Sequence, residues 1–199
     1  TLPDQGGWDR LVYTASGTVT VESGDTVWSV PPYRALWLPD GAPASVANRY
    51  PVAVRVLFFA RHLRAAPLQA RVIALDGFPR DLLLHAVRMC PLDDDSPGRR
   101  ALLTLLTEQL AGQSDAGLDL RLPDDATTRS AADLLRAQPD VAIDVVASRF
   151  GLSRRTLERR FLHQTGISVG TWRRRSRVLD SLEHLAAGVP VTQTAIRSE

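Results

Sequence analysis

IDVVASRFGLSRRTLERRFLHQTGIS, residues 143–168, is the stretch that decides the fold of the C-terminal part of this chain of 199 residues. Ile143, Val146 and Ala147 recur at the i, i+3, i+4 spacing of an amphipathic helix. Gly151 suits the left-handed position that ends such a helix, and the hydroxyl of Ser153 can cap the next one. The stretch therefore predicts two helices joined by a tight turn.

The second of these helices is expected to run from Arg154 to Gln164, with Leu157, Phe161 and Leu162 buried. All 24 basic residues of the chain are Arg, so their abundance alone means little. Their distribution is more informative, because residues 149–177 hold nine Arg against one acid. A helix pair with a purely structural role would mix both signs on its solvated face. The pattern is typical of a helix-turn-helix that reads DNA.

The outer face of this helix supplies the side chains expected to read bases. Arg can pair with the O6 and N7 of guanine, and Glu can accept from the N4 of cytosine. The next helix begins with a run of Arg that more plausibly meets phosphates. The expected DNA contacts are Ser153, Arg154, Arg155, Glu158, Arg159, Arg173, Arg174 and Arg175, of which Arg155, Glu158 and Arg159 are the chief ones.

The strings GLSRRTLERRF and QTGISVGTWRRRSRVLDSLEHLAAGVPV resemble the DNA-binding region of the AraC/XylS family of transcription regulators. That family places one helix-turn-helix unit on either side of a long helix. Residues 191–196 resemble the opening of the second unit, and the sequence stops at Glu199. The resemblance implies a DNA-binding domain whose second unit is incomplete, and we expect the stretch from about Val191 to be poorly ordered or weakly helical.

Residues 10–59 change to the period of β-strands. Short β-branched and aromatic runs alternate with Gly or Pro turns, a pattern typical of an antiparallel barrel or sandwich. The strings WDRLVYTASGTVTV and VPPYRALWLPDGAP resemble the cupin-like sensor half of the same family. The expected fold class is α+β, with an N-terminal antiparallel cupin-like β-barrel followed by helices and a C-terminal all-α helix-turn-helix domain.

Four segments follow from this interpretation. We expect a sensor barrel at 1–76, a helical dimerisation segment at 77–112, a linker at 113–123 and an AraC-type DNA-binding domain at 124–199. The first 122 residues hold 12 Arg and 13 acids, and the remainder holds 12 Arg and 9 acids. The basic part is thus the part expected to face phosphates.

Cupin enzymes hold a metal through His residues, and the resemblance locates the corresponding positions at Asp4, Gly6 and Ala44. None of the three is His, and a transition-metal site needs several N, O or S donors. We therefore expect no bound transition metal, no cofactor and no enzymatic activity. Asp93, Asp94 and Asp95 form a consecutive acidic run, for which a solvated loop is the better interpretation.

The barrel is rich in aromatic residues, and two interpretations stay open for them. Most can be plain core, since Trp and Tyr fill small barrels. Alternatively, some line a pocket for a small-molecule effector, with Arg at its mouth. The residues of this candidate pocket are Trp8, Arg10, Tyr13, Trp28, Tyr33, Arg34 and Trp37.

Two Leu-rich helices are predicted within residues 79–111. Leu102, Leu106 and Leu110 fall along one stripe, which we expect to form a homodimer contact on the helix from about Arg99 to Ala111. One cysteine, Cys90, excludes an internal disulfide and fits a reducing cytoplasm. No apolar run reaches membrane-spanning length and no signal peptide is recognised, so we expect a cytoplasmic protein without a membrane partner.

The leading hypothesis is a sequence-specific, effector-responsive regulator that binds double-stranded DNA as a homodimer. A truncated regulator that binds DNA poorly and acts through dimerisation is an alternative. A cupin-type enzyme with an appended helical domain is a further one, and it fails at the three metal positions.

Overall fold

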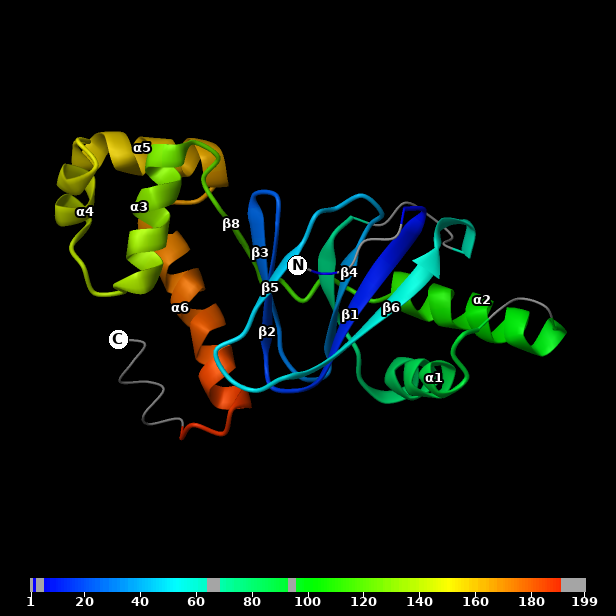
Figure 1. Ribbon diagram of the computed structural model, residues 1–199. Helices are drawn as coiled ribbons and strands as arrows, with labels where there is room; N and C mark the ends of the chain where they lie inside the picture. The colour runs from blue at the N-terminus through cyan, green and yellow to red at the C-terminus, as the bar shows by residue number, and fades with distance from the viewer. Residues whose placement is uncertain (1, 3–5, 64–68, 93–95, 191–199) are drawn as a thin grey trace.

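The computed structural model of the chain describes residues 2, 6–63, 69–92 and 96–190. Two antiparallel four-stranded sheets lie between two groups of helices (Figure 1). The first sheet has the strand order β6-β1-β4-β7, and the second has the order β5-β2-β3-β8. The strands are β1 (Trp8–Ser16), β2 (Val19–Ser23), β3 (Thr26–Val30), β4 (Arg34–Leu38), β5 (Ser45–Ala47), β6 (Ala53–Ala60), β7 (Arg71–Ala74) and β8 (Asp119–Arg121).

The helices follow the expected order. The first group is η1 (Arg61–Leu63), α1 (Gly77–Arg88) and α2 (Pro97–Ala111), and the second is α3 (Ala126–Ala137), α4 (Ile143–Arg149), α5 (Arg154–Thr165) and α6 (Val169–Ala186). The α+β class is therefore confirmed, and closure of the two sheets into a barrel stays a prediction. No helix in the described part of the chain is long and apolar enough to cross a membrane.

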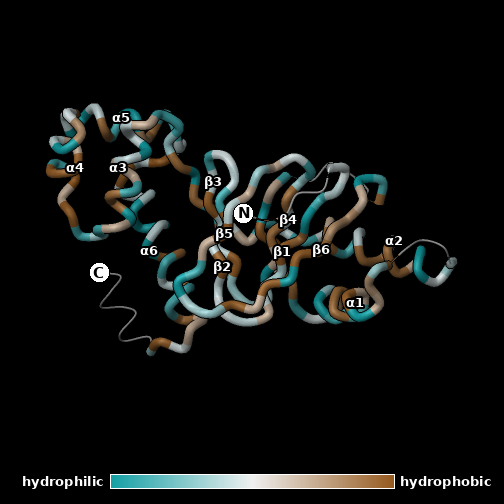
Figure 2. The backbone as a smooth tube through the Cα atoms, viewed as in Figure 1, coloured by the Kyte–Doolittle hydropathy of each residue, from teal (hydrophilic) through white to brown (hydrophobic). Residues whose placement is uncertain are grey.

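The core between the two sheets is formed by alternate residues of their strands. Val12 and Leu36 of the first sheet meet Val21 and Val30 of the second, and all four are fully buried. Figure 2 shows that hydrophobic residues recur through these strands and along α1. The interior of the sheets is thus filled by apolar side chains.

The other face of the first sheet is covered by α1 and α2. Leu11, Trp37 and Ile73 of the sheet pack with Leu106 and Leu110 of α2, and each is at most 2% exposed. The prediction that Leu106 and Leu110 form a dimer contact was therefore wrong. Their stripe is the face that α2 buries against its own sheet, and such residues cannot also meet a second chain.

The second sheet carries the helical domain on its other face. Within the range expected to be a linker, β8 pairs with β3, with Leu120 opposite Val27. Leu120 and Leu122 also belong to the core that α3, α4, α5 and α6 share. The end of the predicted linker is therefore a strand built into both the sheet and the helical core.

We expect Leu122→Ala to lower the free energy of unfolding by about 2–5 kcal/mol, because Leu122 is 1% exposed and its removal leaves a cavity. Urea denaturation should show the sheets and the helical domain unfolding in one transition. Arg121→Ala, which alters a neighbouring exposed side chain, should change stability by under about 1 kcal/mol. A loss of similar size in both variants would contradict the role of Leu122.

Candidate DNA interface

Helices α4 and α5 meet at the turn that the sequence predicts. Gly151 has φ +66°, a left-handed conformation that a residue with a Cβ rarely adopts. The amide of Leu152 then donates to the carbonyl of Ala147 at 2.9 Å. Ser153 is the N-cap of α5, and its hydroxyl accepts from the Thr156 amide at 3.2 Å. These bonds satisfy backbone N–H and C=O groups that would otherwise have no hydrogen-bond partner where one helix ends and the next begins.

The inner face of α5 is held by aromatic packing. Leu157 and Phe161 are fully buried, as expected. Phe161 contacts Trp172 of α6 edge to face, with ring centroids 5.4 Å apart. Leu162 was expected to be buried but is 55% exposed, because the i, i+4 pair Leu157 and Phe161 already spans the buried face. The backbone of α5 is thereby fixed against α6.

The outer face of α5 divides into paired and unpaired residues. Arg154 donates to Glu158 at 2.9 Å and to Asp144 of α4 at 3.3 Å. The hydrogen bond to Glu158, followed by the charge of Asp144, raises the pKa of Arg154. Arg155 and Arg159 are exposed and make no ion pair with another described residue. These two guanidinium groups stay available to an external partner.

The Arg residues at the start of α6 have different environments. Arg173 donates to the carbonyl of Pro139, and burial, followed by the nearby charge of Arg177, lowers its pKa. Arg175 donates to Asp119 at 2.6 Å and to the carbonyl of Gly117 at 3.1 Å. Arg174 is exposed and makes no ion pair with another described residue. Arg173 and Arg175 therefore tie α6 to neighbouring loops, whereas Arg174 faces solvent.

Comparison with known proteins agrees with this arrangement. Residues 146–199 match a family model described as a Helix-turn-helix domain. Over 188 residues the chain is 24% identical to the HTH-type transcriptional regulator NimR of Escherichia coli strain K12, and the aligned part covers 94% of this chain and 69% of that protein. The chain is thus similar to a transcription regulator over most of its length and to a helix-turn-helix family over its C-terminal part. This similarity favours a regulator over the cupin-type enzyme that the sequence left as an alternative.

Two solved structures are similar to this chain. The AraC-like transcriptional activator CuxR has a TM-score of 0.38 at 16% identity, covering 92% of this chain and 72% of its own. ToxT from Vibrio cholerae has a TM-score of 0.40 at 11% identity, covering 98% of this chain and 80% of its own.

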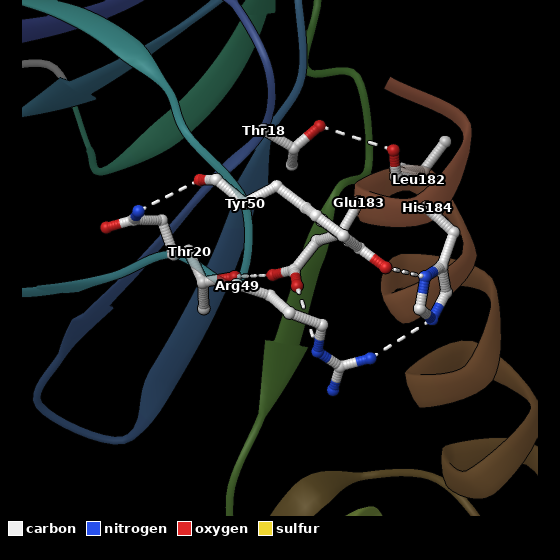
Figure 3. Close-up of polar contacts among 8 residues, drawn as sticks. Thr18, Thr20, Arg49, Tyr50, Leu182, Glu183 and His184 are labelled. Atoms are coloured by element: carbon white, nitrogen blue, oxygen red, sulfur yellow. Dashed lines mark hydrogen bonds and ion pairs between the residues drawn. The ribbon is translucent and has the colours of Figure 1, made fainter. Parts of the chain in front are cut away.

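A polar contact joins the sheets of the regulator to the C-terminal part of α6 (Figure 3). Thr18 donates to the carbonyl of Leu182 at 3.3 Å, and the hydroxyl of Thr20 donates to the carboxylate of Glu183. From the loop between β5 and β6, Arg49 lies 3.0 Å from Nε2 of His184. These residues, with Tyr50, form what we term the α6 contact.

The imidazole of His184 lies at the centre of the α6 contact and is 6% exposed. The Tyr50 hydroxyl lies 2.8 Å from Nδ1 of the ring. A guanidinium can only donate, so Nε2 must accept from Arg49. The ring is then neutral, with its proton on Nδ1 and directed at the Tyr50 oxygen. Both nitrogens of the ring are therefore occupied by side chains of the loop between β5 and β6.

The candidate effector residues are scattered over the N-terminal half. Tyr13, Trp28 and Trp37 are core side chains, at most 7% exposed. Arg10 is fully buried and donates to the carbonyl of Ala42. Tyr33 is 55% exposed, Arg34 donates to its carbonyl at 2.8 Å, and Arg80 lies over its ring. Of the seven, Trp8 alone is in the described lining of a cavity of about 730 Å³ beside β6.

The expected metal positions form no cluster of ligands where the structure describes them. Within the described ranges, no group of three His, Cys, Asp or Glu side chains could hold a metal ion. Ala44 is 4% exposed and packs in the core between the sheets. Asp4, the acidic run 93–95 and the stretch 191–199 lie outside the described residues.

Asp125 is a residue of the site that sequence reasoning missed. Its carboxylate caps α3 through the Thr128 amide at 2.9 Å and also accepts from Gln164 of α5. Arg160 of α5 lies 3.6 Å away. Burial alone would raise the pKa of Asp125, but the bonds from Thr128 and Gln164 and the charge of Arg160 outweigh it and lower the pKa to about 2. Asp125 thus ties α5 to the first helix of its domain.

We expect Asp125→Ala to lower the free energy of unfolding by about 1–2 kcal/mol at neutral pH, and Asp125→Asn by less, because Asn also caps helices. The folded pKa of about 2 lies below the usual 3.8, so the carboxylate stabilises the fold above about pH 4 and loses this effect as the pH falls toward 2. Urea denaturation at several pH values measures this. A gap between wild type and Asp125→Asn that stays constant down to pH 3 would contradict it.

A double-mutant cycle tests the bond between Tyr50 and His184. Tyr50→Phe removes the hydroxyl alone, and His184→Ala removes the ring. We expect a coupling free energy of about 0.5–1.5 kcal/mol from urea denaturation, the net value of one hydrogen bond. Tyr33→Phe, on an exposed tyrosine outside the α6 contact, should show no coupling to His184→Ala. Additive effects of Tyr50→Phe and His184→Ala would show that this hydrogen bond does not contribute to stability.

Proposed function

We propose that this regulator binds specific DNA sequences by inserting α5 into the major groove, with Arg155 and Arg159 reading base edges. The observation that carries the proposal is the exposure of these two side chains on the second helix of a helix-turn-helix, where neither forms an ion pair with another described residue. They are four residues apart and therefore share one face of the helix. Guanine is the base that Arg pairs with best, through O6 and N7.

Glu158 and Arg154 have a related but different role in the proposal. Glu158 lies between Arg155 and Arg159 on the exposed side and can accept from the N4 of cytosine. Its carboxylate is held by Arg154, which Asp144 of α4 also holds. This ion-pair chain orients Glu158 before DNA arrives, and preorganisation lowers the entropy that binding must overcome. Arg154 then acts on DNA mainly through Glu158.

Phosphate contacts are proposed for Arg174, with Ser153 at the N-terminus of α5 as a further donor to the backbone. Arg173 and Arg175 were expected in the same role. Each now has carbonyl or carboxylate partners within the chain, which DNA would have to replace. Arg174 has none among the described residues, so it can contact a phosphate without breaking a bond of the fold.

The proposal includes a response to a small-molecule effector. β8 and the α6 contact connect the sheets to the helical domain at two places, so a ligand that shifts the sheets would act on α6 and through it on α5.

Self-association is also retained in the proposal. Since Leu106 and Leu110 are internal, a dimer contact on α2 would have to use its outward residues, such as Leu105, which is 38% exposed.

We expect Arg159→Ala to weaken binding to a cognate site by about 1–3 kcal/mol and to relax specificity there. Arg174→Ala should weaken binding to all sequences alike and reduce the slope of log K against log salt by about one. The cognate site is selected from random duplexes by the full chain, and affinities are measured by fluorescence anisotropy over a salt series.

Arg88→Ala is the matched control, because Arg88 is an exposed residue of α1 far along the chain from the helix-turn-helix. It should leave both affinity and salt dependence unchanged. Equal losses from Arg159→Ala and Arg174→Ala on cognate and random DNA would overturn the division of roles. No selectable site, with wild type and Arg88→Ala both failing to bind, would refute the proposed function itself.

A further inference from the structure

An apolar cavity of about 730 Å³ lies at the edge of the first sheet. Its walls come from β6, η1, α2 and the C-terminal end of α1 with the residues that follow it. Among the described strands, β6 pairs only with β1, so its other edge is open toward the cavity. In Figure 1 this end of the molecule is opposite the helix-turn-helix. A volume of several hundred Å³ with apolar walls is typical of small-molecule sites.

The lining of the cavity is asymmetric in charge. Its body is made by apolar side chains that include Leu57, Phe59 and Leu103. Arg55 and His62 are the ionisable nitrogen groups in the lining, and no described lining residue is Asp or Glu. Arg55 alternates with Leu57 and Phe59 along β6 and so points to the same side of the strand. The cavity therefore combines an apolar body with a cationic end.

Arg55 has no assigned role within the fold. Its side chain is exposed, and that side chain makes no ion pair or hydrogen bond with another described residue. A guanidinium beside an apolar cavity matches the planar carboxylate of a ligand through two parallel hydrogen bonds. A ligand with an apolar body would gain from leaving water for the walls, at about 25 cal/mol per Å² of apolar surface buried.

We propose that this cavity binds a small amphipathic carboxylate, with the apolar part against Leu57, Phe59 and Leu103 and the carboxylate at Arg55. Apart from Trp8, the site differs from the aromatic pocket that the sequence suggested, whose members Tyr13, Trp28 and Trp37 are packed core. This inference rests on the effector response in the proposed function and supplies its ligand class. It places the ligand between the sheet and α1–α2, on the side away from α6.

Cys90 offers a direct reporter of occupancy. It is the single cysteine of the chain, it is exposed, and it lines the cavity. The rate at which its thiol reacts with a disulfide reagent such as dithionitrobenzoate can be followed in the full chain. Bound ligand should slow this reaction by covering the sulfur. The probes are dodecanoate, dodecan-1-ol and dodecylamine below their micellar concentrations, which share one chain and differ in charge.

We expect dodecanoate to protect Cys90 at about one tenth of the concentration that dodecan-1-ol requires, the factor expected of one charge-assisted hydrogen bond. Dodecylamine should protect least, because its ammonium meets Arg55. Arg55→Gln should remove the advantage of dodecanoate over the alcohol. Arg88→Gln removes the same charge from an exposed position on α1 outside the lining and should preserve that advantage.

Three results would overturn the proposal. The first is equal protection by all three probes, and the second is the same change in Arg55→Gln and Arg88→Gln. The third is protection of Cys90 that rises with protein concentration in the absence of any probe, together with a dimer in sedimentation, which would make a second copy of the chain the occupant. All readouts use the free protein, so failure of DNA binding and failure of this site are separate outcomes.

Discussion

Strand β8 is the constraint on which the arrangement of the two halves depends. Its backbone completes the second sheet by pairing with β3, while Leu120 and the following Leu122 are buried in the core of α3–α6. The indole of Trp172 also donates to the carbonyl of Arg121 in this strand at 2.7 Å. The helical domain cannot separate from the sheets without exposing apolar side chains and breaking strand hydrogen bonds. The two halves therefore share one interface rather than a flexible tether.

Helix α6 extends this constraint along its length. Trp172 near its start holds β8 and Phe161 of α5, and His184 near its end holds the loop between β5 and β6. Because Trp172 touches both β8 and α5, a displacement of the second sheet reaches α5 through two direct contacts. Such a chain of contacts gives a physical route for coupling, and the coupling free energy between Tyr50 and His184 measures one part of it.

The local parts of the structure were predictable from the sequence, and the long-range pairings were not. Gly151, Ser153 and the apolar spacing around Phe161 specify α4 and α5 within one short stretch. In contrast, the stripe of Leu106 and Leu110 identifies a buried face without saying which surface buries it. The stretch before β8 contains Ser, Gly and Asp, a composition that predicts a linker. The strand conformation of β8 itself depends on pairing with β3, more than ninety residues earlier in the chain. The partners of Asp125 likewise come from α5, a separate helix of the fold.

The number of Arg residues in the sequence overstates how many of them are available to contact DNA. A chain without Lys must use guanidinium groups for structural bonds as well as for phosphates and bases. Arg173 and Arg177 converge on the carbonyl of Pro139, a geometry that the several donors of a planar guanidinium allow. Arg175 is held by Asp119, the first residue of β8. The arginines therefore fall into two groups. Arg173, Arg175 and Arg177 bind partners within the chain and fix α6. Arg174, together with Arg155 and Arg159 on α5, has no ion-pair partner among the described residues and can contact an external anion or base.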